Sequence, residues 1–145
     1  MNKTVILIRG CSNSGKSSFA NLIFDIFTAE FPVPNEYCVI CTADDYFTED
    51  GKYNFDAKQL GAAHFYCRNK FKKALEENIE LVILANTSST EKELSYYIEN
   101  AQVFGYKLFS IVMEKRFEGG DNGHNVPEFS LSRQEQNIKN SLKLR

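Results

Sequence analysis

The sequence predicts an α/β fold of three layers, in which helices cover both faces of a small, mainly parallel sheet of about four strands. Short apolar runs rich in β-branched residues alternate with longer segments that carry apolar residues at helical spacing. Such alternation favours β-α-β units with parallel strands and right-handed crossovers. A glycine-rich motif follows the first apolar run, and the length of 145 residues suits a single domain.

The predicted strands are short and mostly apolar. They cover residues 4–9, 37–41, 81–84 and 107–113. The third run, Leu81-Val82-Ile83-Leu84, has no polar residue, so we expect it inside the sheet with both faces covered. Because ligands bind at the C-terminal ends of strands in such sheets, each strand end is a candidate for chemistry.

The predicted helices follow the strands. They cover residues 17–28, 57–78, 90–104 and 130–142. Thr90 and Glu93 match a capping box at the start of the third helix, and Gly105 stands where helices commonly end. Residues 42–56 are expected to be irregular.

The motif that follows the first strand is a phosphate-binding loop. Residues 10–17, Gly10-Cys11-Ser12-Asn13-Ser14-Gly15-Lys16-Ser17, fit G-x-x-x-x-G-K-[ST] at every required position. In this P-loop, backbone N–H groups converge on phosphates and the helix dipole adds favourable charge. Lys16 would reach the β- and γ-phosphates, and the Ser17 hydroxyl would ligate Mg²⁺. The predicted cofactors are ATP and Mg²⁺, and the residues predicted to bind them are Gly10, Ser12, Asn13, Ser14, Gly15, Lys16, Ser17 and Ser18.

Acidic side chains follow the second predicted strand. Asp44 and Asp45 come directly after it. Phosphoryl transfer needs a group that orients and deprotonates the acceptor hydroxyl, and Asp44 is placed where the γ-phosphate would point. Aspartate after a strand also commonly caps a turn, and Asp45 suits that role better. Asp44 is therefore the predicted catalytic base.

Asn86 follows the third predicted strand, where many P-loop proteins place an acid that supports Mg²⁺ or its water. Its amide oxygen is predicted to accept a hydrogen bond from a metal-bound water. The alternative role is to cap the turn after the strand. With Ser17, Asn86 is the predicted metal-site residue.

Basic residues after the fourth strand are candidates for side chains that neutralise negative charge on the transferring phosphate. Arg116 and Arg133 are the predicted catalytic arginines, because the planar guanidinium bonds two phosphate oxygens at once. Residues 114–127 are glycine-rich near their centre and are predicted to form a mobile lid. For each basic residue, a solvated surface role is the alternative. Further candidates for contacts with the acceptor or a phosphate are Lys115, His64, Arg68 and His124.

Composition limits which partners and which cellular location we expect for the protein. A net charge of −2 and a pI of about 5.7 do not suit a protein that grips long nucleic acid by its backbone, although contact with a strand end is compatible. No apolar run approaches bilayer-spanning length and no signal peptide is recognisable, so no membrane partner is expected. Cys38 and Cys41 have redox-motif spacing, but the β-branched residues between them favour a buried strand. Cysteine usage favours a cytoplasmic location.

Together these residues resemble a family of P-loop kinases, the polynucleotide 5′-hydroxyl kinase type, within the superfamily that includes zeta-toxin-like kinases. The family includes kinase-like domains of ubiquitin-ligase-binding proteins, and the resemblance runs from about residue 4 to residue 137. The segments that carry it besides the P-loop are Asp44-Asp45-Tyr46-Phe47, Tyr53-Asn54-Phe55-Asp56, Ala63-His64, Asn86-Thr87 and His124-Asn125-Val126-Pro127.

The resemblance implies roles for single residues. Asp44 would activate a 5′-hydroxyl, Lys16 and Ser17 would hold ATP and Mg²⁺, and either Arg133 or Arg116 would contact phosphates from the closing segment. The chain departs from the family pattern in two places. Phe47 stands where phage-type members have an arginine, and the acid at the end of the third strand is missing.

Three functions are compatible with the sequence. The first is ATP- and Mg²⁺-dependent transfer of phosphate to a 5′-hydroxyl end of RNA or DNA. The second is a kinase for a small metabolite, nucleoside or antibiotic, which the acidic composition favours. The third is a nucleotide-binding module that has lost catalysis and acts through a protein partner, which the missing acid favours. Fold alone does not distinguish them.

Overall fold

The main sheet of the protein has parallel strands throughout. The computed structural model describes residues 2–88, 90–116 and 126–142. Within them the main sheet has four strands in the order β2-β5-β1-β6, and all neighbours pair in parallel. The strands are β1 (Thr4–Arg9), β2 (Cys38–Cys41), β5 (Leu81–Ala85) and β6 (Lys107–Val112). The predicted strands and their parallel pairing are confirmed, and the apolar strand β5 is internal.

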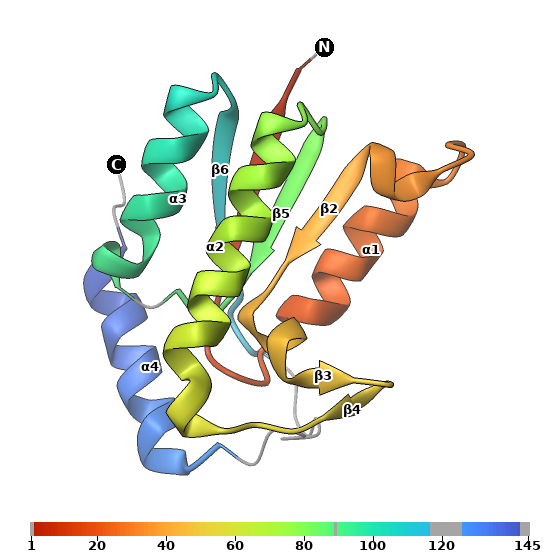
Figure 1. Cartoon of the computed structure of the whole chain (residues 1–145). Coiled ribbons are helices and arrows are strands. Elements are labelled where there is room, and N and C mark those ends of the chain that lie inside the picture. Colours follow the sequence, from red (N-terminus) through yellow and green to blue (C-terminus); the bar gives the residue numbers. More distant parts are fainter. Residues whose placement is uncertain (1, 89, 117–125, 143–145) are drawn as a thin grey trace.

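Helices cover both faces of this sheet, which confirms the three-layer prediction (Figure 1). Helix α1 packs on one face, and α2 and α3 pack on the other. Helix α4 lies below α3 in the view of Figure 1, near the end of the sheet that carries the P-loop. The bounds are α1 (Lys16–Thr28), α2 (Leu60–Glu76), α3 (Glu91–Val103) and α4 (Glu128–Ser141).

The side chains of β1 alternate between two hydrophobic clusters, as the two-residue period of a strand requires. Val5 and Leu7 join α2 and α3 in the larger cluster, whereas Ile8 joins α1 in the smaller one. The Phe71 and Tyr97 rings meet edge to face at 4.9 Å between α2 and α3. This packing on both faces fixes the end of β1, and therefore the start of the P-loop.

Residues 42–56 contain more structure than expected, so the prediction of an irregular segment is wrong in part. After β2 the chain forms a 3₁₀ helix, η2 (Ala43–Phe47), and an antiparallel hairpin of β3 (Thr48–Glu49) and β4 (Lys52–Tyr53). Asp50 and Gly51 both have positive φ, at 50° and 75°. An Asp-Gly pair favours this two-residue turn, so the signal for the hairpin was present in the sequence.

Short 3₁₀ turns precede two of the elements. One is η1 (Pro34–Glu36), before β2, and the other is η3 (Ala57–Gln59), so the predicted helix at 57–78 begins as an α-helix only at Leu60. The predicted ends of α3 agree with the structure. Thr90 Oγ1 accepts a hydrogen bond of 3.3 Å from the Glu93 N–H, and Gly105 has a φ of 74°.

The cysteines of β2 are core residues. Cys38 and Cys41 are fully buried free thiols in different hydrophobic clusters, on opposite faces of the sheet. Burial raises the pKa of Cys38 to about 12 and also raises the pKa of Cys41. This burial confirms the prediction of a buried strand. Because the two thiols lie on opposite faces of the sheet, they cannot act as one redox pair.

Candidate nucleotide-binding site

The P-loop joins β1 to α1 through a sharply bent backbone. Asn13 and Gly15 have φ values of 65° and 90°, in the left-handed region that glycine tolerates best. The Gly10 N–H donates a 3.3 Å hydrogen bond to the Thr87 carbonyl after β5. A Cβ on Gly10 would lie 2.5 Å from Ser14 Oγ, so a larger residue does not fit there. The loop therefore keeps the tight curvature that phosphate binding requires.

The start of α1 is open to an anion. Gly15 is its N-cap residue without a side-chain cap, and the first turn holds no acidic residue. Ser17 and Ser18 are exposed at this end. The first N–H groups of a helix have no partner within the helix, and with the positive end of the helix dipole they form the arrangement that binds phosphate.

Lys16 lies within the loop. Its Nζ donates a 2.7 Å hydrogen bond to the Cys11 carbonyl. Burial lowers the pKa of Lys16 from 10.5 to about 8, and the nearby Asp44 carboxylate partly opposes that shift. Lys16 thus carries a charge that burial disfavours and that a phosphate would stabilise.

We expect nucleotide binding to take up a proton at alkaline pH. With a pKa of about 8, Lys16 is mostly neutral at pH 9, while the triphosphate would raise that pKa towards or above its ordinary value of 10.5. Titration calorimetry with AMPPNP at pH 9, in buffers of different ionisation enthalpy, should show uptake approaching one proton (an order-of-magnitude expectation). Uptake that persists in Lys16→Ala would contradict the assignment.

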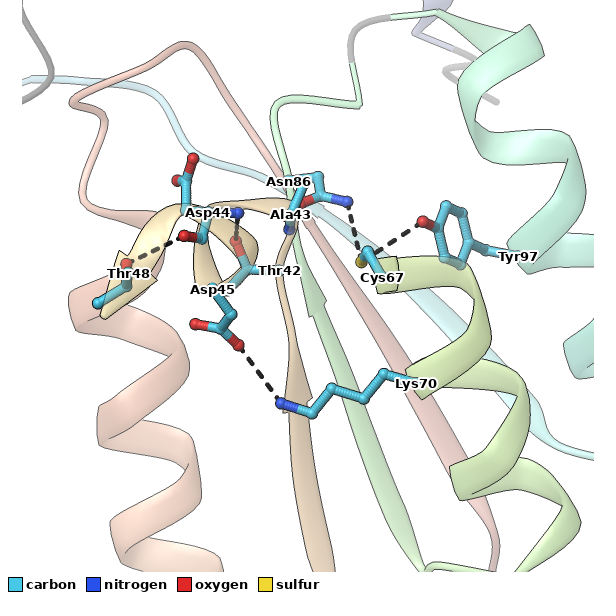
Figure 2. Close-up of polar contacts among 9 residues, drawn as sticks. All are labelled: Thr42, Ala43, Asp44, Asp45, Thr48, Cys67, Lys70, Asn86 and Tyr97. Carbon is cyan, nitrogen blue, oxygen red and sulfur yellow. Dashed lines mark hydrogen bonds and ion pairs between the residues drawn. The ribbon is translucent and has the colours of Figure 1, made fainter. Parts of the chain in front are cut away.

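Asp44 and Asp45 stand side by side on η2 but face different surroundings (Figure 2). The Asp44 backbone N–H donates to Thr42 Oγ1 at 3.2 Å, and its Oδ1 accepts a long hydrogen bond of 3.4 Å from the Tyr53 hydroxyl. Its charge also acts on Lys16 of the P-loop. Asp45 instead pairs with Lys70 of α2 at 3.3 Å. The Asp44 carboxylate thus raises the Lys16 pKa against the effect of burial, whereas the Asp45 carboxylate forms an ion pair with Lys70.

A cavity of about 570 Å³ opens beside the P-loop. Helix α1 and the free edge of β2 form its walls, and its volume is in the range of small-molecule sites. Its lining side chains are Ser17, Asn21, Phe24, Asn35, Val39, Ile40, Thr42, Asp45, Lys70 and Ala85. Ser17 and Asp45 therefore border one shared space.

Asn86 ties together the ends of two strands. Its Oδ1 accepts a 2.9 Å hydrogen bond from the Ala43 N–H, and its Nδ2 donates to Cys67 Sγ at 3.5 Å (Figure 2). The Cys67 sulfur also accepts from the Tyr97 hydroxyl at 3.5 Å. In this structure Asn86 positions the start of η2, and its predicted contact with a metal-bound water stays a prediction.

We expect Asn86→Ala to destabilise the protein by about 1–3 kcal/mol, because the Ala43 N–H would lose its partly buried acceptor. Urea denaturation measures this change. Asn69→Ala, an exposed position on α2, is the matched control and should have little effect. Unchanged stability together with a raised Mg²⁺ requirement would instead favour the metal role.

A known protein resembles most of this chain in sequence. Human NEDD4-binding protein 2 is 36% identical over 104 residues, which is 72% of the chain. The chain spans only 5% of that protein's length, so it resembles one segment of it. No protein-family model matches the sequence.

Solved structures share the fold at low identity. The Pnkp1/Rnl/Hen1 RNA repair complex contains a chain that is 16% identical, with a TM-score of 0.66 over 97% of this chain and 45% of that one. Kti12 of Chaetomium thermophilum with ADP-AlF3 gives 12% identity and a TM-score of 0.60, with coverage of 92% and 79%. The Mycobacterium tuberculosis APS kinase CysC (Cys556Ala mutant) gives 14% and 0.54, with 96% of each chain covered. This chain has the P-loop kinase fold.

The arginines predicted for the P-loop kinase site lie at the surface in the described residues. Arg116 pairs with Glu114, and its side chain is 84% exposed. The exposed Arg133 of α4 lies over the Phe129 ring, 5.5 Å from its centroid. No described contact brings either to the P-loop, so their roles stay predictions. Of the lid expected at 114–127, residues 117–125 lie outside the described part of the chain, and so does His124.

The other candidates on α2 lie apart from the P-loop contacts. The Arg68 guanidinium lies over the Tyr96 ring of α3, at 5.4 Å from its centroid. His64 is partly buried on α2. Lys115 is exposed in the segment after β6. Their predicted contacts with an acceptor or phosphate stay predictions.

Two contacts at the P-loop were missed by the sequence analysis. Gln134 of α4 accepts a 2.9 Å hydrogen bond from the Ser12 N–H. Arg9, at the end of β1, is 4% exposed and donates to the Ser88 carbonyl and to Ser141 at the end of α4. The Ser12–Gln134 bond holds α4 against the P-loop, and the Arg9–Ser141 bond holds the end of α4 against the end of β1. Nothing in the local sequence signals them, because the partners are far apart in the chain.

The residues at the start of α1 suit a Mg²⁺ ion that arrives bound to a nucleotide. Within the described residues, no three His, Cys, Asp or Glu side chains form a metal cluster. Mg²⁺ that arrives with phosphates needs few protein ligands, and the exposed Ser17 hydroxyl at the start of α1 is a suitable one.

No helix within the described residues is long and apolar enough to cross a bilayer.

Proposed function

We propose that the protein binds ATP with Mg²⁺ and transfers the γ-phosphate to an acceptor hydroxyl, with a 5′-hydroxyl end of RNA or DNA as the acceptor. The observation that carries the proposal is the bent P-loop at the start of α1, with the Lys16 Nζ held 2.7 Å from the Cys11 carbonyl and the Asp44 carboxylate opposing the lowering of the Lys16 pKa. Similarity to a chain of an RNA repair complex and to an APS kinase supports it.

In the proposed reaction, the P-loop amides and Lys16 would hold the β- and γ-phosphates, and Ser17 would ligate Mg²⁺, which would supply positive charge to offset that of the phosphates. Asp44 orients the acceptor hydroxyl and takes its proton as the new oxygen–phosphorus bond forms. The bond from the γ-phosphorus to the β-γ bridging oxygen breaks in line, and ADP leaves. Arg133 or Arg116 would add positive charge on the closing segment.

A small hydroxylated molecule is a second candidate acceptor, because the cavity beside Ser17 has about the volume of a small-molecule site. A nucleotide-binding module without catalysis is the third candidate. It is favoured by the absence of an acid after β5, where Asn86 makes structural contacts instead.

The deciding experiment is transfer of labelled γ-phosphate from ATP, with Mg²⁺, to 5′-hydroxyl RNA and DNA oligonucleotides. Lys16→Ala and Asp44→Asn are the controls. Label at the 5′ end that both substitutions abolish would support the polynucleotide acceptor. Confirmed ATP binding without such label would move the assignment to a small acceptor, or to the module without catalysis if none is labelled.

A further inference from the structure

The segment Tyr53-Asn54-Phe55-Asp56 has no part in the proposed reaction, although it carries some of the resemblance to the kinases. It begins in β4, the second strand of the hairpin that follows η2. Tyr53 pairs with Thr48 of β3, and the Asn54 N–H donates a 2.8 Å hydrogen bond to the Phe47 carbonyl at the end of η2. The hairpin therefore holds this segment against η2.

Aromatic neighbours fix the Tyr53 ring, which is partly buried against the larger hydrophobic cluster. The buried Phe47 ring meets it edge to face, with 6.3 Å between the ring centroids. The Phe55 ring lies almost parallel to it, at an interplanar angle of 15° and a centroid distance of 6.4 Å. Because aromatic pairs favour these geometries, the ring is restricted and its hydroxyl has a defined position.

The Tyr53 hydroxyl donates its hydrogen bond to Asp44 Oδ1. Burial raises the pKa of Tyr53 to about 12, helped by the Asp44 charge and by this bond, so the hydroxyl keeps its proton at neutral pH. The Asp44 backbone is held as well. Its N–H donates to Thr42 Oγ1, and its carbonyl accepts a 3.0 Å hydrogen bond from Thr48 Oγ1 (Figure 2). Contacts therefore hold both the backbone and the side chain of Asp44.

The Tyr53 bond also bears on the charge near the P-loop. The Asp44 charge acts on Lys16, and opposite charges in proximity attract. A direct ion pair would engage the lysine that is expected to bind phosphate and the carboxylate that is expected to receive a proton. Instead, the Lys16 Nζ donates to the Cys11 carbonyl, and Asp44 Oδ1 accepts from Tyr53. A carboxylate with one such bond has the capacity to accept others.

We propose that Tyr53 is a positioning residue for phosphate transfer, and that its hydroxyl holds the Asp44 carboxylate in the orientation that accepts the proton of the acceptor hydroxyl. Tyr53 itself transfers no proton. Its bond to Asp44 is 3.4 Å long, and bonds to a catalytic base are often long before the substrate binds and tighten in the complex. This inference rests on the proposed phosphotransferase function.

The test compares Tyr53→Phe with Tyr46→Phe. Tyr46 is the matched control, because it lies on η2 and its hydroxyl donates to Gln59 Oε1 at 2.9 Å instead of to Asp44. Tyr53→Phe keeps the ring and its packing. It should slow single-turnover transfer of labelled phosphate from ATP to a 5′-hydroxyl oligonucleotide by about 10- to 100-fold, the range for a misplaced catalytic group. The affinities for AMPPNP and for the oligonucleotide should be unchanged, and Tyr46→Phe should keep the wild-type rate.

A double substitution tests whether Tyr53 acts through Asp44. In the Asp44→Asn protein, Tyr53→Phe should slow transfer little further, because the carboxylate that the hydroxyl positions is already absent. A full loss in that background, or a wild-type rate in Tyr53→Phe alone, would overturn the proposal. So would a loss confined to the KM for the oligonucleotide, because Tyr53 would then bind the acceptor itself. Equal losses in Tyr46→Phe and Tyr53→Phe would also overturn it.

Ionisation of Tyr53 distinguishes failure of this inference from failure of the proposed function. If no oligonucleotide is labelled, NMR of ¹³Cζ-labelled tyrosine follows the Tyr53 pKa without transfer. Asp44→Asn should lower that pKa from about 12, because the charge that raises it is lost, and Asp45→Asn should leave it unchanged. This pattern would support the contact between Tyr53 and Asp44 although transfer had failed. An equal Tyr53 pKa in all three proteins would overturn it.

Discussion

Lys16→Ala is expected to abolish phosphate transfer and to weaken ATP binding at least tenfold, while the protein stays folded. Lys16 lies in the P-loop and its Nζ donates a hydrogen bond to the Cys11 carbonyl. The ammonium group can therefore exchange this acceptor for a phosphate oxygen. Loss of this cation removes a charged hydrogen bond in the ground state and stabilisation of charge during transfer. Calorimetry with AMPPNP and labelled transfer measure the two effects.

Replacing Lys16 with the similarly long but uncharged methionine should not destabilise the protein without nucleotide at pH 7. Because burial lowers the Lys16 pKa from 10.5 to about 8, the charged side chain opposes folding at neutral pH. The folded state binds fewer protons than the unfolded state between these values, so wild-type stability should rise with pH through this window. Lys16→Met should be at least as stable as wild type at pH 7, and its advantage should shrink as the pH rises from about 8 to above 10.5.

Lys92→Ala is the control for both measurements, because Lys92 is exposed on α3, away from the P-loop. It should leave transfer, ATP affinity and the pH dependence of stability unchanged. ATP binding by Lys16→Ala at wild-type affinity would remove Lys16 from the site.

Asp44→Asn is expected to lower kcat by roughly 10²–10⁴-fold, the range for loss of a general base, while ATP affinity changes by less than about threefold. An amide cannot take the acceptor proton, but its oxygen keeps the shape that accepts from the Tyr53 hydroxyl. The substitution should therefore preserve the fold of η2. Single-turnover transfer and AMPPNP calorimetry separate the chemical step from binding.

Asp45→Asn is the matched control for Asp44→Asn, since both aspartates lie on η2 and the Asp44 carboxylate raises the Lys16 pKa, whereas Asp45 pairs with Lys70. Its kcat should stay within a few-fold of wild type, because the Asp45 carboxylate pairs with Lys70. Comparable losses in both variants would mean that Asp44 has no special role in the chemistry.

Local patterns were sufficient for most of the fold. Each strand of the main sheet was a short, largely apolar run that includes β-branched residues, and α1 and α3 had clear boundaries at Gly15, Thr90 and Gly105. These signals depend on a few neighbouring residues, so sequence alone carries them. The hairpin at 48–53 was missed although its Asp50-Gly51 turn is a local signal, because its strands are only two residues each.

The sequence by itself determined the P-loop, because spacing and residue type in one continuous segment define it. Only the tertiary structure decided how other residues relate to that loop. It placed Asp44 near Lys16, joined Asp45 to Lys70, gave Asn86 to the Ala43 N–H and brought Gln134 to Ser12. These partners come from separate elements, and their distances depend on how the sheet and helices pack. Such packing is a collective property of the buried core, which no local pattern specifies.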